Sequence, residues 1–369
     1  MRYKPLYPPK RHKFVTLHMD GLLLLGIIVI AALGLVTLYS AEQSIPILER
    51  QMIRLVLAFA AMILVAQMPP RLLKAITPWL YAATLLLLFM VLFIGHIGKG
   101  GQRWLDLWFF RFQPAEIMKI AVPMMVARSL DDQRLPPRLK NLIMPFFFIM
   151  IPVILTAKQP DLGTAILILS SGFFVVFFAG LSWRLLCVGA GLGIAALPML
   201  WLVMLDYQKE RVLVFLDPTR DPLGKGYHII QSKIAIGSGG LYGKGWLNGS
   251  QSQLEFLPER TTDSIFAVFS EEFGLAGCLL MLTVYLCIIA RGLYMSTQAQ
   301  ETFSRLLAGS VTMTLFVYVL VNIGMVSGLC PAVGIPLPLV SYGGTSMVTL
   351  MVGFGILISI HTHRTLLQR

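Results

Sequence analysis

A carboxylate stands at the entrance to an apolar stretch of membrane-spanning length. The segment LPERTTDSIFAVFSEEFG, residues 257–274, places Asp263 directly before that stretch. Capping of the following helix by Thr261 or Thr262, with Asp263 in or beside the first turn, explains such a carboxylate structurally. Chemistry on a substrate presented at the membrane surface explains it functionally. The two interpretations stay open on the residues alone.

Two further carboxylates, Glu271 and Glu272, lie two to three turns deeper in the same stretch. An ionisable side chain at the centre of a spanning helix costs about 2.5–3.5 kcal/mol on insertion scales, so its presence needs a reason. Adjacent residues on a helix do not share a face. We therefore expect at least one of the two to face protein, water or a partner.

A second polar cluster lies in GGQRWLDLWFFRFQPAEIMK, residues 100–119. Pro114 suits the first turn of a helix, and Glu116 and Lys119, three residues apart, then share one face and can pair. The pair either locks two helices together or forms a polar notch that binds a charged headgroup.

A third cluster, KQPDLGTA, places Lys158 and Asp161 in a tight turn between two apolar runs. A solvated turn explains both charges. Asp161 at a helix start also gains from the helix dipole.

The elements that position these residues are membrane helices. The chain has 369 residues, of which 56% are hydrophobic and 13% charged, and its mean hydropathy is +0.76. A soluble domain of this size could not bury so much apolar surface. The net charge of +12 comes from basic residues that flank the apolar runs, which indicates membrane topology and not nucleic-acid binding.

The sequence predicts an all-α polytopic membrane protein, 1–369, without a separate soluble domain. Apolar runs of spanning length recur along the chain. We predict ten spans, at roughly 21–40, 51–68, 78–95, 115–130, 141–157, 162–180, 185–205, 264–291, 303–324 and 345–361.

The positive-inside rule places both termini in the cytoplasm and all three polar clusters near the outer face. One long extracytoplasmic loop, 206–263, then joins the seventh and eighth spans. Its segment GYHIIQSKIAIGSGG is compatible with one amphipathic element lying on the membrane.

No metal site follows from side-chain spacing. The four cysteines include no C-x-x-C pair and the six histidines are scattered, so neither a zinc site nor a disulfide framework is indicated.

Several long motifs together resemble the SEDS family of shape, elongation, division and sporulation proteins. The resemblance covers nearly the whole chain. It rests on FQPAEIMK, KQPDLGTA, LDPTRDPLGKGYHIIQSKIAIGSGGLYGKGWLNGSQSQLEFLPER, TDSIFAVFSEE and VNIGMVSGLCPAVGIPLPLVSYGGTS. QSQLEFLPER and SYGGTS resemble the family's elongation members more than its division members.

The resemblance implies a peptidoglycan glycosyltransferase of the bacterial cytoplasmic (inner) membrane, with its active site on the periplasmic or outer side. It implies lipid II as substrate, cell elongation and rod shape as the process, and a class B penicillin-binding protein (a transpeptidase) with other rod-complex membrane proteins as partners. The family's essential aspartate matches Asp263. Its other polar positions match Glu116, Lys119, Asp161, Arg50 and Arg211.

One departure from the family pattern lies beside the aspartate. The family commonly reads E-R-H-T-D-F, whereas this chain has Thr261 in place of the histidine and Ser264 in place of the phenylalanine. If that histidine moves a proton in the family, this protein does without it at that position.

The implied reaction is an inverting transfer in which Asp263 would act as general base. Arg50, Arg211 and Lys119 are candidates to bind the leaving pyrophosphate, since arginine in particular matches phosphate oxygens. A divalent cation, Mg²⁺ or Mn²⁺, is compatible with such a leaving group, although no motif holds one. Ser341, in the helix-disrupting segment CPAVGIPLPLVSYGG, is a further candidate for substrate binding; a glycine-rich turn is the structural alternative.

Two other functions remain open at this stage. A lipid II flippase predicts a hydrophilic passage through the bundle and no need for one particular carboxylate. A non-catalytic scaffold for the transpeptidase predicts that Asp263→Ala is tolerated.

Overall fold

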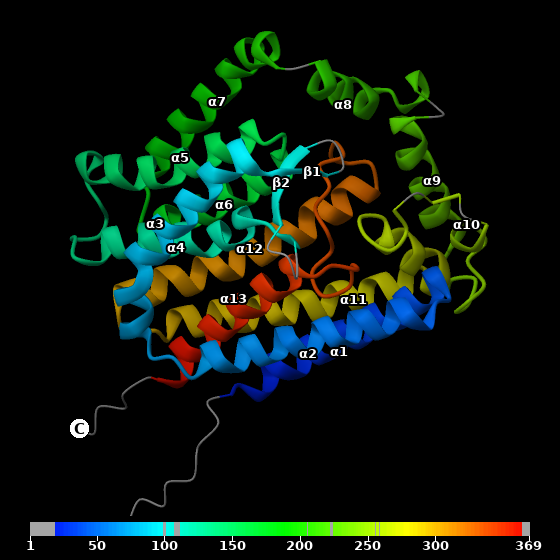
Figure 1. Cartoon of the computed structure of the whole chain (residues 1–369), viewed down its shortest axis with the longest axis horizontal. Coiled ribbons are helices and arrows are strands. Elements are labelled where there is room, and N and C mark those ends of the chain that lie inside the picture. Colours follow the sequence, from blue (N-terminus) through cyan, green and yellow to red (C-terminus); the bar gives the residue numbers. More distant parts are fainter. Residues whose placement is uncertain are drawn as a thin grey trace, which may run out of the picture.

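The computed structural model describes residues 19–98, 101–106, 111–204, 206–221, 224–254, 256–257 and 259–363. Helices make up most of this part of the chain. The long ones pack into one bundle, apart from α7 (Trp183–Val203), which is largely exposed and lies to one side (Figure 1). The prediction of a helical membrane protein is confirmed at this level. One local departure was not predicted: three short antiparallel strands in the order β1 (His96–Gly98), β2 (Gly101–Asp106) and β3 (Arg111–Phe112).

Each of the ten predicted ranges coincides with a helix. The largest differences are at the starts of the second and third helices, which begin before the predicted boundaries, and at the end of the eighth predicted range, where the helix runs on to Thr297. In chain order the long helices are α1 (Gly21–Glu42), α2 (Ile45–Ala66), α3 (Pro70–Ile94), α4 (Pro114–Asp131), α5 (Ile143–Lys158), α6 (Leu162–Phe178), α7 (Trp183–Val203), α11 (Ile265–Thr297), α12 (Thr302–Val326) and α13 (Thr345–Thr362).

Local sequence explains several helix starts. Asp20 caps α1 by accepting a hydrogen bond from the backbone N–H of Leu23 at 2.9 Å. Proline occupies the first or second position of α2, α3 and α4, where its missing N–H would have no helical partner. Pro114 therefore begins α4 as the sequence predicts.

Length and hydropathy identify membrane spans within the described part of the chain. Six helical segments are long and apolar enough to cross a membrane, and two shorter apolar helices lie at Leu162–Phe178 and Trp183–Ala196. The chain is therefore a multi-pass membrane protein. The six segments are Gly21–Glu42, Pro70–Ile94, Leu139–Lys158, Ile265–Thr297, Thr302–Val326 and Thr345–Thr362.

The bundle is organised around α4 and α12. Helix α12 packs against α4, α6 and α11, while α4 packs against α3, α5 and α6. Helix α13 lies along α2, and α1 lies along α11 (Figure 1). Both α4 and α12 are largely buried, so their polar side chains face protein and not the surrounding lipid.

Helix α11 is broken at Gly274, whose φ is +63°. The segment before the break, Ile265–Phe273, is almost wholly buried. Residues 240–245 lie against the break and bond its backbone: Lys244 and Gly245 donate to the carbonyls of Glu271 and Glu272, each at 3.0 Å. Non-helical backbone at membrane depth needs partners of this kind.

The predicted long loop is largely helical where it is described. It contains α8 (Asp206–Leu216), the 3₁₀ turn η2 (Pro218–Arg220), α9 (Lys225–Ser238) and α10 (Ser250–Gln253). The predicted amphipathic element coincides with α9, which packs on α11. A second 3₁₀ turn, η1 (Leu139–Leu142), precedes α5.

Candidate functional site

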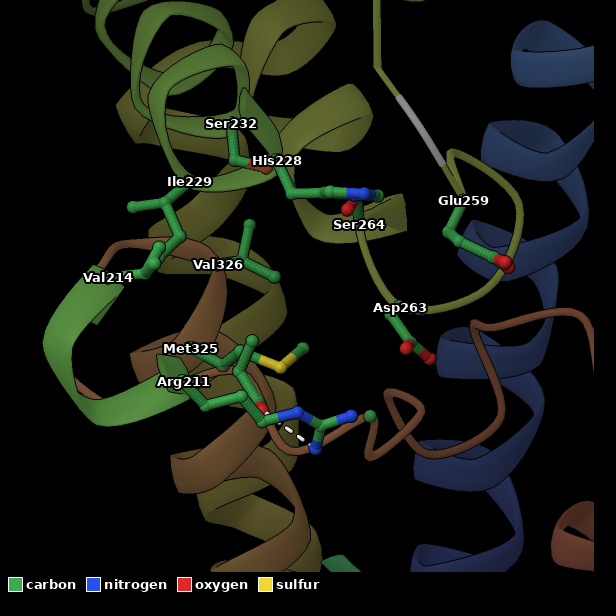
Figure 2. Close-up of a pocket in the computed structure, with 12 residues that line it drawn as sticks. Arg211, Val214, His228, Ile229, Ser232, Glu259, Asp263, Ser264, Met325 and Val326 are labelled. Carbon is green, nitrogen blue, oxygen red and sulfur yellow. Dashed lines mark hydrogen bonds between the residues drawn. The ribbon is translucent and has the colours of Figure 1, made fainter. Parts of the chain in front are cut away.

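A cavity of about 220 Å³ lies where α8, α9 and α12 meet the turn that precedes α11 (Figure 2). Asp263 and Arg211, both predicted from the sequence, line it together. The remaining lining residues are Val214, His228, Ile229, Ser232, Glu259, Ser264, Met325, Val326, Ala332 and Gly334. The volume suits water and the reacting end of a substrate, since whole-ligand pockets usually span roughly 300–1,000 Å³.

Asp263 lies one residue before the N-cap of α11. The N-cap is Ser264, so the prediction that Thr261 or Thr262 caps this helix is wrong. The reason is a tight turn in front of the helix: the backbone N–H groups of Thr262 and Ser264 donate to the Glu259 carbonyl at 3.0 and 3.2 Å. The chain therefore enters the helix later than the threonines suggest.

The Asp263 backbone is tied to α12 and to the segment before α13. The side-chain amide of Asn322 donates to the Asp263 carbonyl at 3.0 Å and to the Ile335 carbonyl at 2.7 Å. The Asn322 side chain is fully buried. Because these bonds involve the main chain, they leave the carboxylate directed into the cavity (Figure 2).

Ser341 supports the same turn and does not line the cavity. Its hydroxyl donates to the Thr262 carbonyl at 2.6 Å and accepts from the Leu337 N–H at 2.7 Å. The residue is buried. The structure thus uses Ser341 to hold two loops together, and its predicted contact with substrate gains no support from this position.

Arg211 extends from α8 on the opposite wall from Asp263 (Figure 2). Its guanidinium donates to the Ala332 carbonyl at 3.4 Å. The remaining N–H groups of this fork are suited to phosphate oxygens. The cavity therefore combines an acidic and a basic side chain that are 52 positions apart in the sequence.

His228 and Glu259 also line the cavity, and neither was predicted from the sequence. Figure 2 shows the imidazole of His228 between the helix α9 backbone and the turn that carries Glu259 and Asp263. Loss of water around the ring lowers the pKa of His228, against an opposing effect of Glu259. The only sequence signal was a histidine on the amphipathic element of the long loop.

The second polar cluster forms a separate buried site. Lys119 Nζ and Glu116 Oε2 are 2.7 Å apart, with both side chains almost fully buried. Lys119 also donates to the hydroxyl of Tyr318 on α12. The expected Glu116–Lys119 pair is present, but neither residue lines the Asp263 cavity.

Asp161 belongs to the same region as that pair. Its side chain caps α6 through the N–H of Thr164 at 3.1 Å, and it accepts from the Gln113 amide at 2.7 Å. Arg103 Nη1 lies 3.9 Å from Asp161 Oδ1, the oxygen that also accepts from Thr164. The expectation that Asp161 lies at a helix start is confirmed. The expectation of a solvated turn is wrong for Asp161, because its side chain is buried.

Arg50 lies apart from both sites. It is exposed in the second turn of α2 and does not line the cavity. Its neighbour Gln51 is buried and donates to the Ser341 carbonyl at 3.3 Å. Arg50 therefore lies close to the loops that hold Asp263 but outside the cavity itself.

Glu271 and Glu272 both face protein. Glu271 is fully buried and accepts from Lys244 Nζ at 2.6 Å and from the Gln251 N–H at 3.1 Å. Glu272 accepts from the hydroxyl of Ser40 on α1. These carboxylates anchor the α9–α10 loop and α1 to the broken helix.

Within the described ranges, no group of three or more His, Cys, Asp and Glu side chains is arranged to hold a metal ion. In the cavity, Asp263 and Glu259 are the acidic residues. These residues alone do not form a protein-held metal site.

These features define a class: a multi-pass membrane protein with a carboxylate–arginine cavity at one end of its bundle. A family model described as cell cycle protein, for FtsW, RodA and SpoVE, matches residues 13–366. The chain belongs to this family, which is the SEDS family that its motifs resemble.

Similar proteins place the chain more narrowly. It is 52% identical over 364 residues to the peptidoglycan glycosyltransferase MrdB of Escherichia coli K12, with 98% of each chain covered. It is 33% identical to the probable peptidoglycan glycosyltransferase FtsW of Geobacter metallireducens, covering 93% of this chain and 94% of that one.

Two solved structures share the fold. One comes from work on coordinated polymerization and crosslinking by a peptidoglycan synthase complex; its chain is 35% identical with a TM-score of 0.82, and the match covers 94% of this chain and 98% of that one. The other is the rod shape determining protein RodA of Thermus thermophilus, 30% identical with a TM-score of 0.72, covering 94% and 97%.

Proposed function

We propose that this chain is a peptidoglycan glycosyltransferase that polymerises lipid II into glycan strands for cell elongation and rod shape. The observation that carries the proposal is the Asp263–Arg211 cavity, in a chain 52% identical to a protein of that named activity. The cavity offers a base and a phosphate-binding cation at opposite walls, which are the two groups that transfer from a pyrophosphate-linked sugar requires.

The reaction is an inverting displacement. The 4-hydroxyl of the acceptor GlcNAc attacks the anomeric carbon of the donor MurNAc, and a C–O bond forms while the bond to the lipid pyrophosphate breaks. Asp263 accepts the hydroxyl proton as the new bond forms. The undecaprenyl pyrophosphate leaves with the electron pair and its extra negative charge.

Arg211 stabilises that developing charge. Its planar fork matches phosphate oxygens in a bidentate manner. Its backbone anchor at Ala332 holds the guanidinium on the wall opposite Asp263, so base and leaving group occupy different sides of the sugar. An in-line displacement needs this separation.

Four predicted site residues lie outside the cavity and would bind other parts of the substrate: Glu116, Lys119, Asp161 and Arg50. Gly163, two residues after Asp161, approaches the loop that lines the cavity: a Cβ there would lie 2.6 Å from the Val333 carbonyl oxygen. This contact shows that the start of α6 packs directly against the loop that lines the cavity.

A divalent cation, Mg²⁺ or Mn²⁺, would be carried by the substrate's pyrophosphate and not by a protein cage. No step above depends on it. Such an ion would neutralise leaving-group charge when bound. Chelation with EDTA followed by addition of either ion tests the requirement.

The partner would be a class B penicillin-binding protein transpeptidase, within an assembly of rod-complex membrane proteins. The structural similarity to a chain from a peptidoglycan synthase complex supports it. We place the protein in the bacterial inner membrane with ten spans, both termini cytoplasmic and the Asp263 cavity on the outer side. Cysteine accessibility at Tyr242→Cys, in the α9–α10 loop, tests that side: outside labelling supports it, inside labelling opposes it.

The experiment for the function uses the purified complex with its transpeptidase, lipid II and Mg²⁺, and detects glycan polymer on a gel. Polymer from the complex supports the proposal. Lipid II crossing liposomes without polymer would favour a flippase. Partner binding with neither activity would favour a scaffold.

A further inference from the structure

The proton taken by Asp263 must leave the cavity before the next transfer. In a processive polymerisation the base is protonated once for every sugar linkage. In a cavity that is partly closed by protein, a second titratable group beside the base speeds the passage of that proton to water. The residues that line the cavity with Asp263 decide which group this is.

His228 is the side chain placed for this step. It projects from α9 into the cavity, and its ring lies beside the turn that carries both Asp263 and Glu259 (Figure 2). Helix α9 is held in place by packing on α11 and α12, and Ile229, next in the chain, is buried against the same wall.

We infer that His228 is a proton-relay residue that takes the proton from Asp263 and passes it to water at the Glu259 rim of the cavity. The inference rests on the proposed function. It adds a titratable group from α9 to a cavity whose two carboxylates both come from the turn before α11.

Exposure changes along the path in the direction that a relay needs. Asp263 is partly exposed, whereas His228 and Glu259 are exposed. The proton therefore moves from the more enclosed group towards solvent. Glu259, close enough to affect the imidazole, stabilises the imidazolium that forms in transit.

Three charged groups line the cavity with His228. Glu259 and Asp263 come from the turn before α11, and Arg211 comes from α8. Outside the lining, α9 carries Lys233, which lies beside Gly328, and the α11 carboxylates Glu271 and Glu272 are bonded to Lys244 and Ser40. Helix α10 has no charged residue, and α12 contributes Met325 and Val326. In η2 and its cap, Arg220 and Asp217 are 3.8 Å apart at the surface. Loss of water around the ring lowers the pKa of His228, against an opposing effect of Glu259, and so favours the neutral imidazole that can accept a proton.

The step is balanced in protons. Asp263 takes one proton from the acceptor hydroxyl during transfer. That proton then moves, directly or through a cavity water, to an imidazole nitrogen of His228, which regenerates the carboxylate. His228 releases it to bulk water, and the departing pyrophosphate leaves with the negative charge that balances it.

The test measures polymerisation rate against pH and buffer concentration, using the complex with its transpeptidase and lipid II. The variants are His228→Gln, His228→Ala and, as a matched control, Gln231→Ala on the same helix but outside the cavity lining. Both His228 variants are expected to lose at least about tenfold in kcat, with little change in KM. Added imidazole should rescue His228→Ala, and the rate of His228→Gln should rise with buffer concentration.

The control and the wild type should be insensitive to added imidazole and to buffer concentration. His228 variants with wild-type kcat at every pH would overturn the relay. Reduced kcat without rescue by imidazole or buffer would do so too, because it indicates a packing role. Whatever the His228 variants do, polymer from wild type and none from Asp263→Asn supports the proposed function. No polymer from wild type would overturn the proposed function itself.

Discussion

Asn322 donates its side-chain amide to the backbone carbonyl of Asp263 at 3.0 Å, and the same amide reaches the Ile335 carbonyl at 2.7 Å. One buried side chain on α12 therefore fixes both the turn that carries the carboxylate and the loop that lines the opposite part of the cavity. Tyr318, which holds Lys119, lies one helical turn away. Helix α12 connects the two polar sites.

Replacing Asn322 should misplace Asp263 without removing it. Asn322→Asp keeps the size of the side chain, but it removes both donated hydrogen bonds and turns a buried carboxylate towards two carbonyl oxygens. We therefore expect a loss of about 3–5 kcal/mol in unfolding free energy. A displaced carboxylate should lower polymerisation about a hundredfold. Thermal melting and a glycan gel measure the two effects. Full activity in Asn322→Asp would show that this anchor does not position the base.

Substitutions should separate a structural role of the Glu116–Lys119 ion pair from a role in binding substrate. Lys119→Met leaves Glu116 buried without its cation and should cost about 3–5 kcal/mol in stability. The double change Glu116→Gln with Lys119→Met should recover most of that loss. Melting temperatures of wild type, Glu116→Gln, Lys119→Met and the double variant form a double-mutant cycle. If the double variant is stable and inactive, the pair acts on substrate; if it is stable and active, the pair is structural.

The break in α11 should depend on Gly274. Its φ of +63° disfavours any side chain, and an added Cβ would lie 2.3 Å from the backbone nitrogen of Gly243. Gly274→Ala should therefore cost roughly 1–3 kcal/mol. Gly237→Ala on α9 is the control, since nothing lies within 4 Å of its added Cβ. Equal melting temperatures for the two variants would contradict this account.

Stability should fall at mildly acid pH through His228. Its pKa is lowered in the folded protein, so the unfolded chain binds the proton first as pH falls below the ordinary value of 6.5. The stabilising contribution is complete above that value and is lost below it. The effect should be small, because the residue is exposed. The melting temperature of wild type should drop more than that of His228→Gln between pH 7.5 and 5, and a constant difference would contradict the prediction.

Sequence patterns anticipated the elements that depend on local signals. Apolar runs located the long helices because lipid requires them. Pro114 marked the start of α4, and the three-residue spacing of Glu116 and Lys119 marked their pair. Each signal lies within a few residues of the feature that it predicts.

The cavity could not be predicted from local patterns, because it forms from contacts between segments that are far apart in the sequence. Arg211, His228 and Asp263 lie on three separate elements, and the packing of α8 on α9 and of α9 on α11 brings them together. The break at Gly274 was also missed, because the apolar run continues through it. Its partner segment, 240–245, reads as a glycine-rich turn, and the sequence does not say where such a turn docks.

The central claim is that the Asp263 carboxylate acts as the base for glycan polymerisation. The most direct measurement compares wild type with Asp263→Asn, which keeps the size of the side chain and removes the carboxylate, in complex with the transpeptidase and supplied with lipid II and Mg²⁺. The account predicts polymer from wild type and none from the variant, with partner binding and melting temperature unchanged. Equal polymer from both proteins would contradict it.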